Sequence, residues 1–191
     1  MEQPVETSPR QNSAPARSRS LLRLNAWAWV RDLAISVVIA GLIIVFLYQP
    51  VKVEGTSMMP WLTDQQRIFI NKFVYKFEDI QRGDVVVFWY PMDTSKSYIK
   101  RVVGLPGETV RISGGRVYIN ERVLNEPYVV SEYLESQSYP PVRVEPDHYY
   151  VLGDHRSSSN DSRSWGTVSR EYIYGKAVLV YWPVDKFGIL K

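Results

Sequence analysis

Two short segments of this sequence carry side chains that together could perform acyl transfer. Ser57 lies in the segment GTSMMP, residues 55–60, and Lys100 lies in the segment YIKRVV, residues 98–103. A serine hydroxyl is a weak nucleophile until a neighbouring base takes its proton, and a neutral lysine amine is such a base. The pair therefore predicts a hydrolase that forms a covalent intermediate and requires no metal ion or cofactor.

Each of the two residues also has an ordinary structural explanation. Ser57 follows an apolar extended run and precedes Pro60, a context that is typical of turns and helix N-caps. Lys100 would share one face of a strand with Tyr98 and Val102, but lysines also occupy exposed sheet edges, where their charge opposes aggregation. A buried strand position could lower the pKa of Lys100 from about 10.4 to about 7 to 8, as a base needs, whereas an exposed edge position would not.

A third polar segment, GDHRSSSNDSR, spans residues 153–163 directly after an expected strand. Hydroxyls, carboxylates and arginines concentrated in one loop could orient a catalytic group. The same composition is also typical of a solvated turn with Asp/Arg pairs. By itself this segment does not distinguish the two interpretations.

Composition excludes several classes of protein. The 191 residues include no cysteine, so disulfides, thiolate metal sites and a cysteine nucleophile are excluded. There are two histidines, His148 and His155, and no H-E-x-x-H motif, which argues against a zinc hydrolase. The net charge of +3 and the lack of a dense basic stripe give no support to nucleic-acid binding.

The sequence divides into three parts. Residues 1–24, rich in Pro, Ser, Gln and Arg, are predicted to be a disordered cytoplasmic tail. Residues 25–49 are predicted to be an uncleaved transmembrane anchor with an interfacial start, because residues 33–48 carry no charge and tryptophans precede them. The arginines before this run exceed the acidic residues, which predicts a cytoplasmic N-terminus. A buried helix of a soluble domain and a cleaved signal peptide are the alternatives.

Residues 50–191 are predicted to form an all-β domain outside the cytoplasm. Short β-rich runs alternate with turn signals such as Leu105-Pro106-Gly107 and Gly114-Gly115. The expected strands are residues 67–69, 84–89, 98–103, 109–112, 116–119, 148–152 and 177–181.

Taken together and in this order, the segments resemble those of the type I signal peptidases, which are membrane-bound Ser/Lys proteases. The motifs that carry the resemblance are VEGTSMMP (53–60), GDVVVF (83–88), YIKRVVGLPGE (98–108) and GDHRSSSNDSR (153–163). The resemblance implies a mostly β fold, with one N-terminal transmembrane helix followed by an all-β catalytic domain of the signal-peptidase type. It implies the removal of signal peptides from exported precursors, without a cofactor, at the plasma membrane, or at the thylakoid membrane in a photosynthetic cell.

The resemblance also implies roles for single residues. Ser57 is expected to be the nucleophile and Lys100 the general base. Ser159 is expected to form a hydrogen bond with the lysine amine. Asp161 and Arg163 are expected to form a supporting ion pair, and Asp154 to support the same loop. The oxyanion and substrate pocket is expected to involve Gly55, Val53, Met58 and Ile99, and to accept small side chains at the first and third positions before the cut.

Two departures from the family pattern stand out. His155 occupies a position where the family usually has asparagine, so its hydrogen bonds are expected to differ. Some members have a serine oxyanion donor two positions before the nucleophile, where this chain has Gly55. The expected partners are precursor proteins and the lipid bilayer, and the secretion machinery is a further candidate. No nucleic acid is expected.

Several alternatives compete with this interpretation. Ser97 and Lys100 fit an S-x-x-K motif, but K-T-G is missing and the domain is short for a penicillin-binding fold. A Ser-His-Asp hydrolase lacks its G-x-S-x-G elbow. A self-cleaving repressor-type protease shares the dyad but carries a DNA-binding module. The alternative from another class is a non-catalytic, membrane-anchored β-domain that binds exported chains or envelope partners.

Overall fold

The computed structural model describes residues 18–190, with side chains described for residues 27–42 and 48–190. The chain divides into two compact units, Met1–Ile44 and Val45–Lys191. Residues 1–17 of the predicted tail lie outside the described residues.

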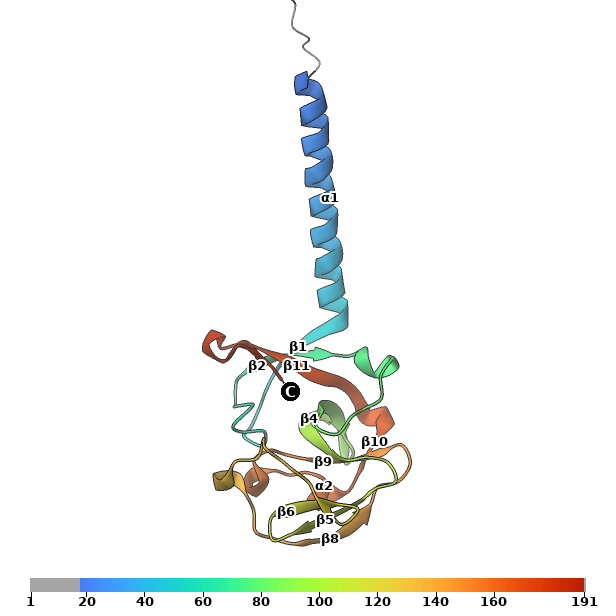
Figure 1. Cartoon of the computed structure of the whole chain (residues 1–191), viewed down its shortest axis with the longest axis vertical. Coiled ribbons are helices and arrows are strands. Elements are labelled where there is room, and N and C mark those ends of the chain that lie inside the picture. Colours follow the sequence, from blue (N-terminus) through green and yellow to red (C-terminus); the bar gives the residue numbers. More distant parts are fainter. Residues whose placement is uncertain (1–17, 191) are drawn as a thin grey trace, which may run out of the picture. The chain divides into compact units, whose positions relative to one another are not determined.

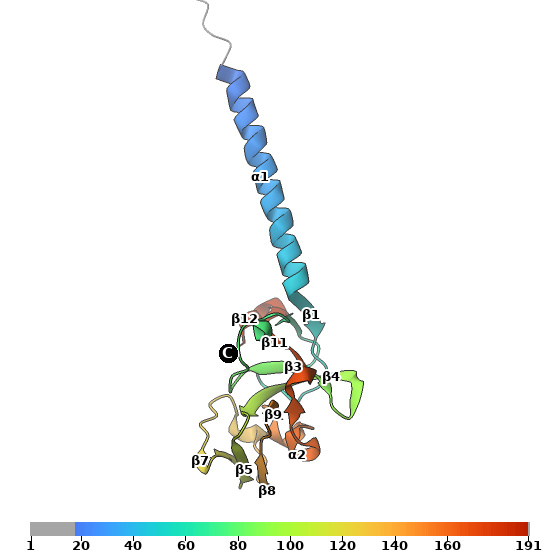
Figure 2. The same ribbon diagram turned by 90° about the vertical axis from the view of Figure 1, so that its right-hand side faces the viewer.

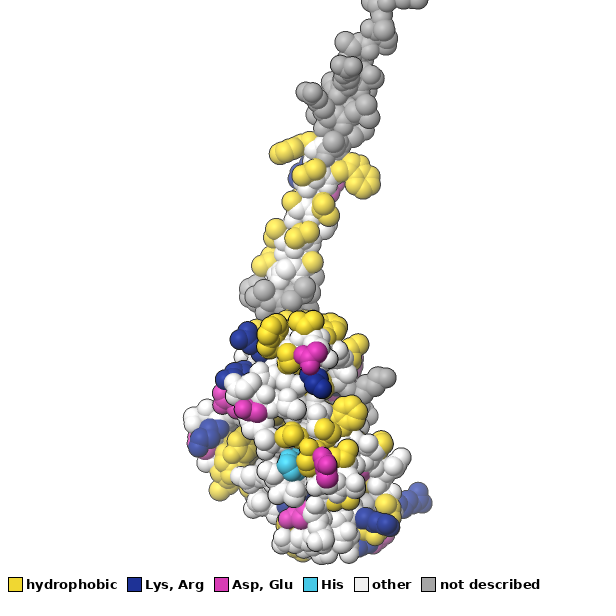
Figure 3. All heavy atoms as spheres, turned by 90° about the vertical axis from the view of Figure 1, so that its left-hand side faces the viewer, with side chains coloured by type: hydrophobic (Ala, Val, Ile, Leu, Met, Phe, Trp, Pro, Cys, Tyr) yellow, Lys and Arg dark blue, Asp and Glu magenta, His cyan; other side chains and the backbone are white. Residues whose placement is uncertain are grey.

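Helix α1, Ser18–Leu47, accounts for the described part of the first unit. Over residues 27–42 its large apolar side chains are exposed, among them Trp29 at 78% and Leu33 at 66%, and hydrophobic side chains follow one another along the face seen in Figure 3. Arg31 and Asp32 form an ion pair of 2.8 Å on this helix. Among the residues whose side chains are described, 27–42 and 48–190, no helix is both long and apolar enough to cross a membrane, so the predicted transmembrane helix is not found there.

The second unit is built mainly from antiparallel strands in two sheets. The larger sheet has eight strands in the order β1-β2-β11-β3-β4-β9-β10, with β12 paired to β11. Its strands are β1 Tyr48–Lys52, β2 Arg67–Asn71, β3 Val85–Tyr90, β4 Asp93–Gly104, β9 His148–Leu152, β10 Val168–Ser169, β11 Ile173–Trp182 and β12 Gly188–Ile189.

The smaller sheet has four strands in the order β7-β6-β5-β8. These strands are β5 Thr109–Ser113, β6 Arg116–Ile119, β7 Arg122–Val123 and β8 Tyr139–Arg143, and β5, β6 and β8 lie together in Figure 1. Figure 2 shows the same region turned by 90°.

The helices of the second unit are short. They are α2 Ser162–Trp165 and the 3₁₀ turns η1 Val74–Lys76, η2 Ser131–Tyr133, η3 Arg156–Ser158, η4 Arg170–Tyr172 and η5 Val184–Lys186. The unit is therefore mostly β, as the sequence predicts. All seven predicted strands overlap observed ones, β2 to β6, β9 and β11.

The core follows from the alternation of apolar residues along the strands. In β2 the side chains of Ile68 and Ile70 are completely buried, while the intervening Phe69 is only partly buried and stacks on Tyr181. Successive side chains of a strand point to opposite faces, so Ile68 and Ile70 line one cluster. That cluster extends to Val53 and Met58, and it thus lies directly beneath the segment that carries Ser57.

Candidate active site

The turn that carries Ser57 is fixed at both ends by the main chain and by the core. Val53 donates its N–H to the carbonyl of Gln66 at 2.7 Å and accepts from Gln65 at 2.9 Å. Gly55 has a φ of +90°, a value that glycine adopts without steric cost, and it donates its N–H to Asp64 at 2.9 Å. These bonds fix the turn in front of the serine.

Met58 anchors the other side of the turn. Its side chain is 1% exposed and packs in the core cluster with Val53 and Leu62. The prediction that Met58 lines the substrate pocket is therefore wrong. Its thioether points into the core, which holds the preceding residue, Ser57, at the surface of the cluster.

The predicted nucleophile and base are in direct contact. The Nζ of Lys100 lies 2.7 Å from the Oγ of Ser57 and donates to the carbonyl of Ile99 at 3.0 Å. Lys100 pairs with Val86 of β3, and it is only 4% exposed. The structure therefore excludes the alternative of a charged lysine at an exposed sheet edge.

Burial lowers the pKa of Lys100 to about 8. Desolvation of the ammonium is the largest cause, the carboxylates of Asp161 and Asp154 oppose it, and the guanidinium of Arg163 adds to it. The neutral amine is therefore far more populated near neutral pH than in an exposed lysine. With one hydrogen given to the Ile99 carbonyl, its lone pair can accept the Ser57 hydroxyl proton.

The loop after β9 lies against the turn that carries Ser57, residues 55–60 (the nucleophile turn). His155 donates its backbone N–H to the carbonyl of Ser57 at 3.0 Å, and the hydroxyls of Thr56 and Ser158 are 3.4 Å apart. A Cβ atom on Gly153 would come within 2.5 Å of the Ser57 carbonyl oxygen, so glycine alone permits this approach.

Ser159 does not make the hydrogen bond that the resemblance implies. Its Oγ is buried and has no hydrogen-bond partner among the described residues, whereas Lys100 instead uses Ser57 and the main chain. The hydroxyl lies next to the backbone of Gly153, because a Cβ atom on that glycine would come within 2.2 Å of it. The prediction of a hydrogen bond between Ser159 and Lys100 is therefore wrong.

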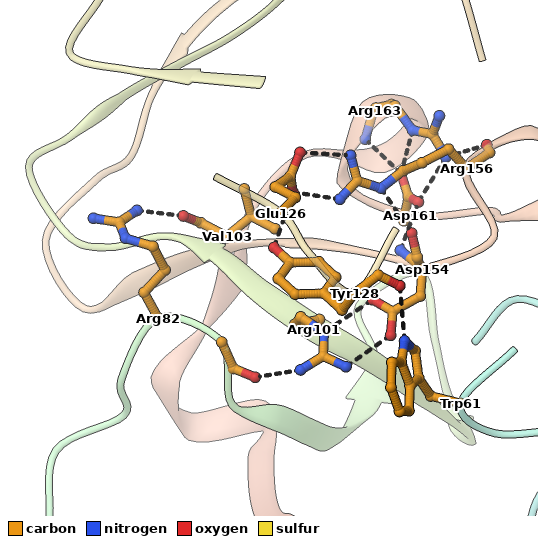
Figure 4. A network of polar contacts seen from close by, with 12 residues as sticks. Trp61, Arg82, Arg101, Val103, Glu126, Tyr128, Asp154, Arg156, Asp161 and Arg163 are labelled. Atoms are coloured by element: carbon orange, nitrogen blue, oxygen red, sulfur yellow. Dashed lines mark hydrogen bonds and ion pairs between the residues drawn. The ribbon is translucent and has the colours of Figure 1, made fainter. Parts of the chain in front are cut away.

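A layer of buried ion pairs supports the loop (Figure 4). The guanidinium of Arg101 donates to both carboxylate oxygens of Asp154 at 2.9 and 2.7 Å, and Arg163 pairs with Asp161 at 2.8 Å. Both aspartates are completely buried. Asp161 also accepts the backbone N–H of Gly153 at 3.0 Å, which ties the two ends of the loop together.

Sequence reasoning missed the acidic partners that come from outside the loop. Arg156 pairs with Glu126 at 2.5 Å, and Arg163 also pairs with Glu135. The centroid of the Tyr128 ring lies 4.2 Å from the Arg101 guanidinium, and Figure 4 shows the two side chains next to each other. No signal in the sequence indicates these partners, because the sequence does not show that the three arginines are buried and therefore need further acceptors.

A cleft of about 400 Å³ opens beside the contact between Ser57 and Lys100. Val53, Gly55 and Ile99, three of the residues that the sequence places in the expected pocket, are among the residues that line this cleft. Its walls come from β1 and the nucleophile turn on one side and from residues 97–100 of β4 on the other. Among the described residues, no group of three or more His, Asp or Glu side chains is arranged to hold a metal ion.

Comparisons with known proteins give one consistent match. Residues 26–182 match the family model described as signal peptidase, peptidase S26. The chain is 37% identical over 192 residues to a probable signal peptidase I-2 of Synechocystis sp., which covers 97% of this chain and 83% of that protein. It is 37% identical over 193 residues to a signal peptidase I of Leptolyngbya laminosa, covering 97% and 92% of the two chains.

A third relative comes from a different group of bacteria. Identity to a signal peptidase I of Bacillus amyloliquefaciens is 37% over 185 residues, covering 91% of this chain and 95% of that protein. Among solved structures, a signal peptidase I from Enterococcus faecalis V583 is 31% identical, with a TM-score of 0.46 over 52% of this chain and 97% of that one.

Proposed function

This chain belongs to the signal peptidase family, peptidase S26, and is a hydrolase of that family; we propose that it removes signal peptides from exported precursors with Ser57 as nucleophile and Lys100 as general base. One observation carries this proposal. The Lys100 amine and the Ser57 hydroxyl are 2.7 Å apart, and the lysine is almost completely buried. Proximity and a lowered pKa are the two properties that such a base needs.

The proposed reaction has two steps. Neutral Lys100 accepts the Ser57 hydroxyl proton as the oxygen attacks the carbonyl carbon before the cut, which forms a tetrahedral oxyanion. The resulting ammonium then gives its proton to the leaving amine, and the C–N bond breaks to leave an acyl-enzyme. Lys100, neutral again, takes a proton from water as the water oxygen attacks the ester carbon, and the ammonium returns that proton to the Ser57 oxygen as the ester C–O bond breaks, which releases the acid product and restores the serine.

The oxyanion needs hydrogen-bond donors, and we assign one of them to the backbone N–H of Ser57. Gly55 has no hydroxyl to offer from the position where some family members carry serine. A single donor of this kind is worth about 3 to 4 kcal/mol in the transition state, so its orientation matters.

The cleft fits a precursor segment in extended conformation. Among the described strands, residues 97–99 of β4 pair only with β3, while the partnership with β9 begins at Arg101. The free edge before Arg101 can accept a peptide as an added strand. The lining by Val53 and Ile99 supports the preference for small side chains at the first and third positions before the cut.

We further propose that residues 25–49 anchor the protein in the plasma membrane, or in the thylakoid membrane of a photosynthetic cell. The uncharged residues 33–48 and the excess of arginine before them support this topology, with residues 50–191 outside the cytoplasm. Protease added to spheroplasts should digest residues 50–191 and spare an epitope on the N-terminal tail. Protection of residues 50–191 would exclude this topology.

The catalytic proposal is tested by covalent labelling. A peptide analogue that acylates serine, with alanine at the first and third positions before its reactive carbonyl, should label the purified full chain at Ser57. The labelled residue is identified by mass spectrometry of the digested protein. A non-catalytic binding domain would bind the peptide without acylation, and that outcome would reject the enzyme mechanism.

A further inference from the structure

His155 contacts the main chain on both sides of the nucleophile. Its backbone N–H donates to the carbonyl of Ser57 at 3.0 Å, and its ring Nδ1 lies 3.3 Å from the carbonyl oxygen of Thr56. A carbonyl oxygen can only accept, so Nδ1 carries the hydrogen in this contact. One residue therefore donates to two consecutive peptide carbonyls.

The Thr56 carbonyl belongs to the same peptide unit as the Ser57 N–H. That unit is planar and trans, so its C=O and N–H point in opposite directions, and fixing one fixes the other. The carbonyl accepts from the Met59 N–H at 3.1 Å within the turn, and the His155 ring is its second donor, from outside the turn. A hydrogen bond accepted by the carbonyl also polarises the unit and makes its N–H a stronger donor. We propose that His155 is a positioning residue that aims the Ser57 N–H at the oxyanion; this inference rests on the proposed function.

The histidine ring is itself held in place. It stacks on the ring of Tyr133 from η2, with centroids 4.1 Å apart and an angle of 39° between the planes. The main chain around it is fixed as well, because Ser158 donates to the His155 carbonyl at 3.0 Å. The side chain of Arg156 donates to the carbonyl of Gly153 at 2.9 Å, and its guanidinium is bound by Glu126. A ring supported in this way can hold a peptide plane against thermal motion.

The geometry separates this role from that of a proton-transfer base. The contact of Nδ1 is with a main-chain carbonyl, whereas the hydroxyl of Ser57 is met by Lys100. An asparagine amide can donate to the same carbonyl, but an aspartate carboxylate of the same size cannot. The pair His155→Asn and His155→Asp therefore separates hydrogen-bond donation from side-chain volume, and His155→Leu, which removes the donor without adding a charge, separates donation from the charge of the aspartate.

The experiment measures kcat and KM on a precursor peptide with the full chain, at a pH well above the pKa of Lys100. His155→Asn should stay within about threefold of the parent in kcat, while His155→Asp and His155→Leu should lose about tenfold to a hundredfold with KM unchanged. The matched control is His148→Leu, because His148 also approaches a carbonyl through Nδ1, that of Pro146 at 2.9 Å, away from Ser57. Its kcat should not change.

Two further measurements make each outcome decisive. Melting temperatures of the Asn and Asp variants should agree, and that comparison stands even where the Leu variant does not fold. Equal kcat for Asn and Asp, or a loss expressed only in KM, would overturn the role of His155. Ser57→Ala is run beside them: wild-type cleavage by that variant overturns the proposed function itself, whereas an inactive Ser57→Ala with fully active His155 variants removes only the positioning role.

Discussion

Arg101, the residue that follows Lys100 on β4, forms a bidentate ion pair with Asp154, the residue that precedes His155. Neighbouring residues of a strand point to opposite faces. The strand therefore presents its lysine to Ser57 on one face and binds the supporting loop through its arginine on the other. One pair of adjacent residues thus fixes the proposed base relative to the loop that contacts the nucleophile turn.

The first prediction concerns this ion pair. Asp154→Asn should lower the free energy of unfolding by about 3 kcal/mol, because it leaves the buried Arg101 guanidinium without its carboxylate. Urea denaturation measures the change. The matched control is Asp93→Asn, which breaks the exposed pair with Lys96 and should leave the denaturation midpoint where it is. Equal effects of the two substitutions would contradict the structural role of the buried pair.

The second prediction concerns the dyad. Ser57→Ala and Lys100→Met should each lower kcat at least about a thousandfold while the fold is retained, because both side chains act in one proton transfer. Circular dichroism checks the fold, and cleavage of a precursor gives the rate. Lys96→Met, on the same strand but 64% exposed in its side chain, should keep the parent rate. Near-normal cleavage by either dyad variant would remove that residue from the mechanism.

The third prediction concerns the pH dependence of the activity, which follows from the lowered pKa of Lys100. Since burial lowers its pKa from 10.5 to about 8, kcat/KM should rise with pH through about 8 and be lost below it. If the acid limb disappears on replacement of His155 or His148 instead, a histidine is the base.

The lowered pKa of Lys100 also makes the free energy of unfolding depend on pH. The unfolded state binds the Lys100 proton up to its usual 10.5, and the folded state releases it near 8, so stability rises between these two values. At neutral pH the penalty is roughly 3 kcal/mol. Lys100→Met should therefore be more stable than the parent at pH 7 by an amount of this order, and the difference should shrink as pH rises towards 10.5. A gain in stability that does not vary with pH would argue for improved packing alone.

The fourth prediction concerns Gly153. Its replacement by alanine would bring a Cβ within 2.2 Å of the Ser159 hydroxyl and 2.5 Å of the Ser57 carbonyl oxygen, so the loop must move away from the nucleophile turn. We expect a loss of about 1 to 3 kcal/mol in stability together with a fall in kcat. Gly188→Ala, whose added Cβ would meet nothing closer than 3.9 Å, serves as the control. An active and stable Gly153→Ala would show that the loop tolerates displacement.

Much of the β-fold could be predicted because apolar alternation and turn residues mark the strands clearly. Strand β8 was missed, since Pro140 and Pro141 are residues that strands usually exclude. The two prolines are tolerated at the edge of the smaller sheet because, among the described strands, β8 pairs only with β5. Strand β1 was missed because its first residues continue the apolar run of the helix.

The site could be predicted in part for a different reason. Ser57 and Lys100 stand in motifs, and the order of the motifs indicated that they meet. The partners of the loop arginines could not be located, because Glu126 and Glu135 are brought to them by tertiary packing across some 30 residues of sequence. The side-chain conformation of Ser159 also follows from packing against Gly153, which no sequence pattern encodes.

The unpaired edge of β4 beside Lys100 also bears on which polypeptides can be cut. An edge strand offers main-chain donors and acceptors that only an extended segment can meet, because the amides of a helix or a folded sheet are already engaged with one another. On the proposed binding mode, cleavage would be restricted to stretches that have not yet acquired structure. The enzyme would then distinguish an unfolded junction from a folded protein by its lack of internal order, and folded proteins would be spared without any need for an inhibitor.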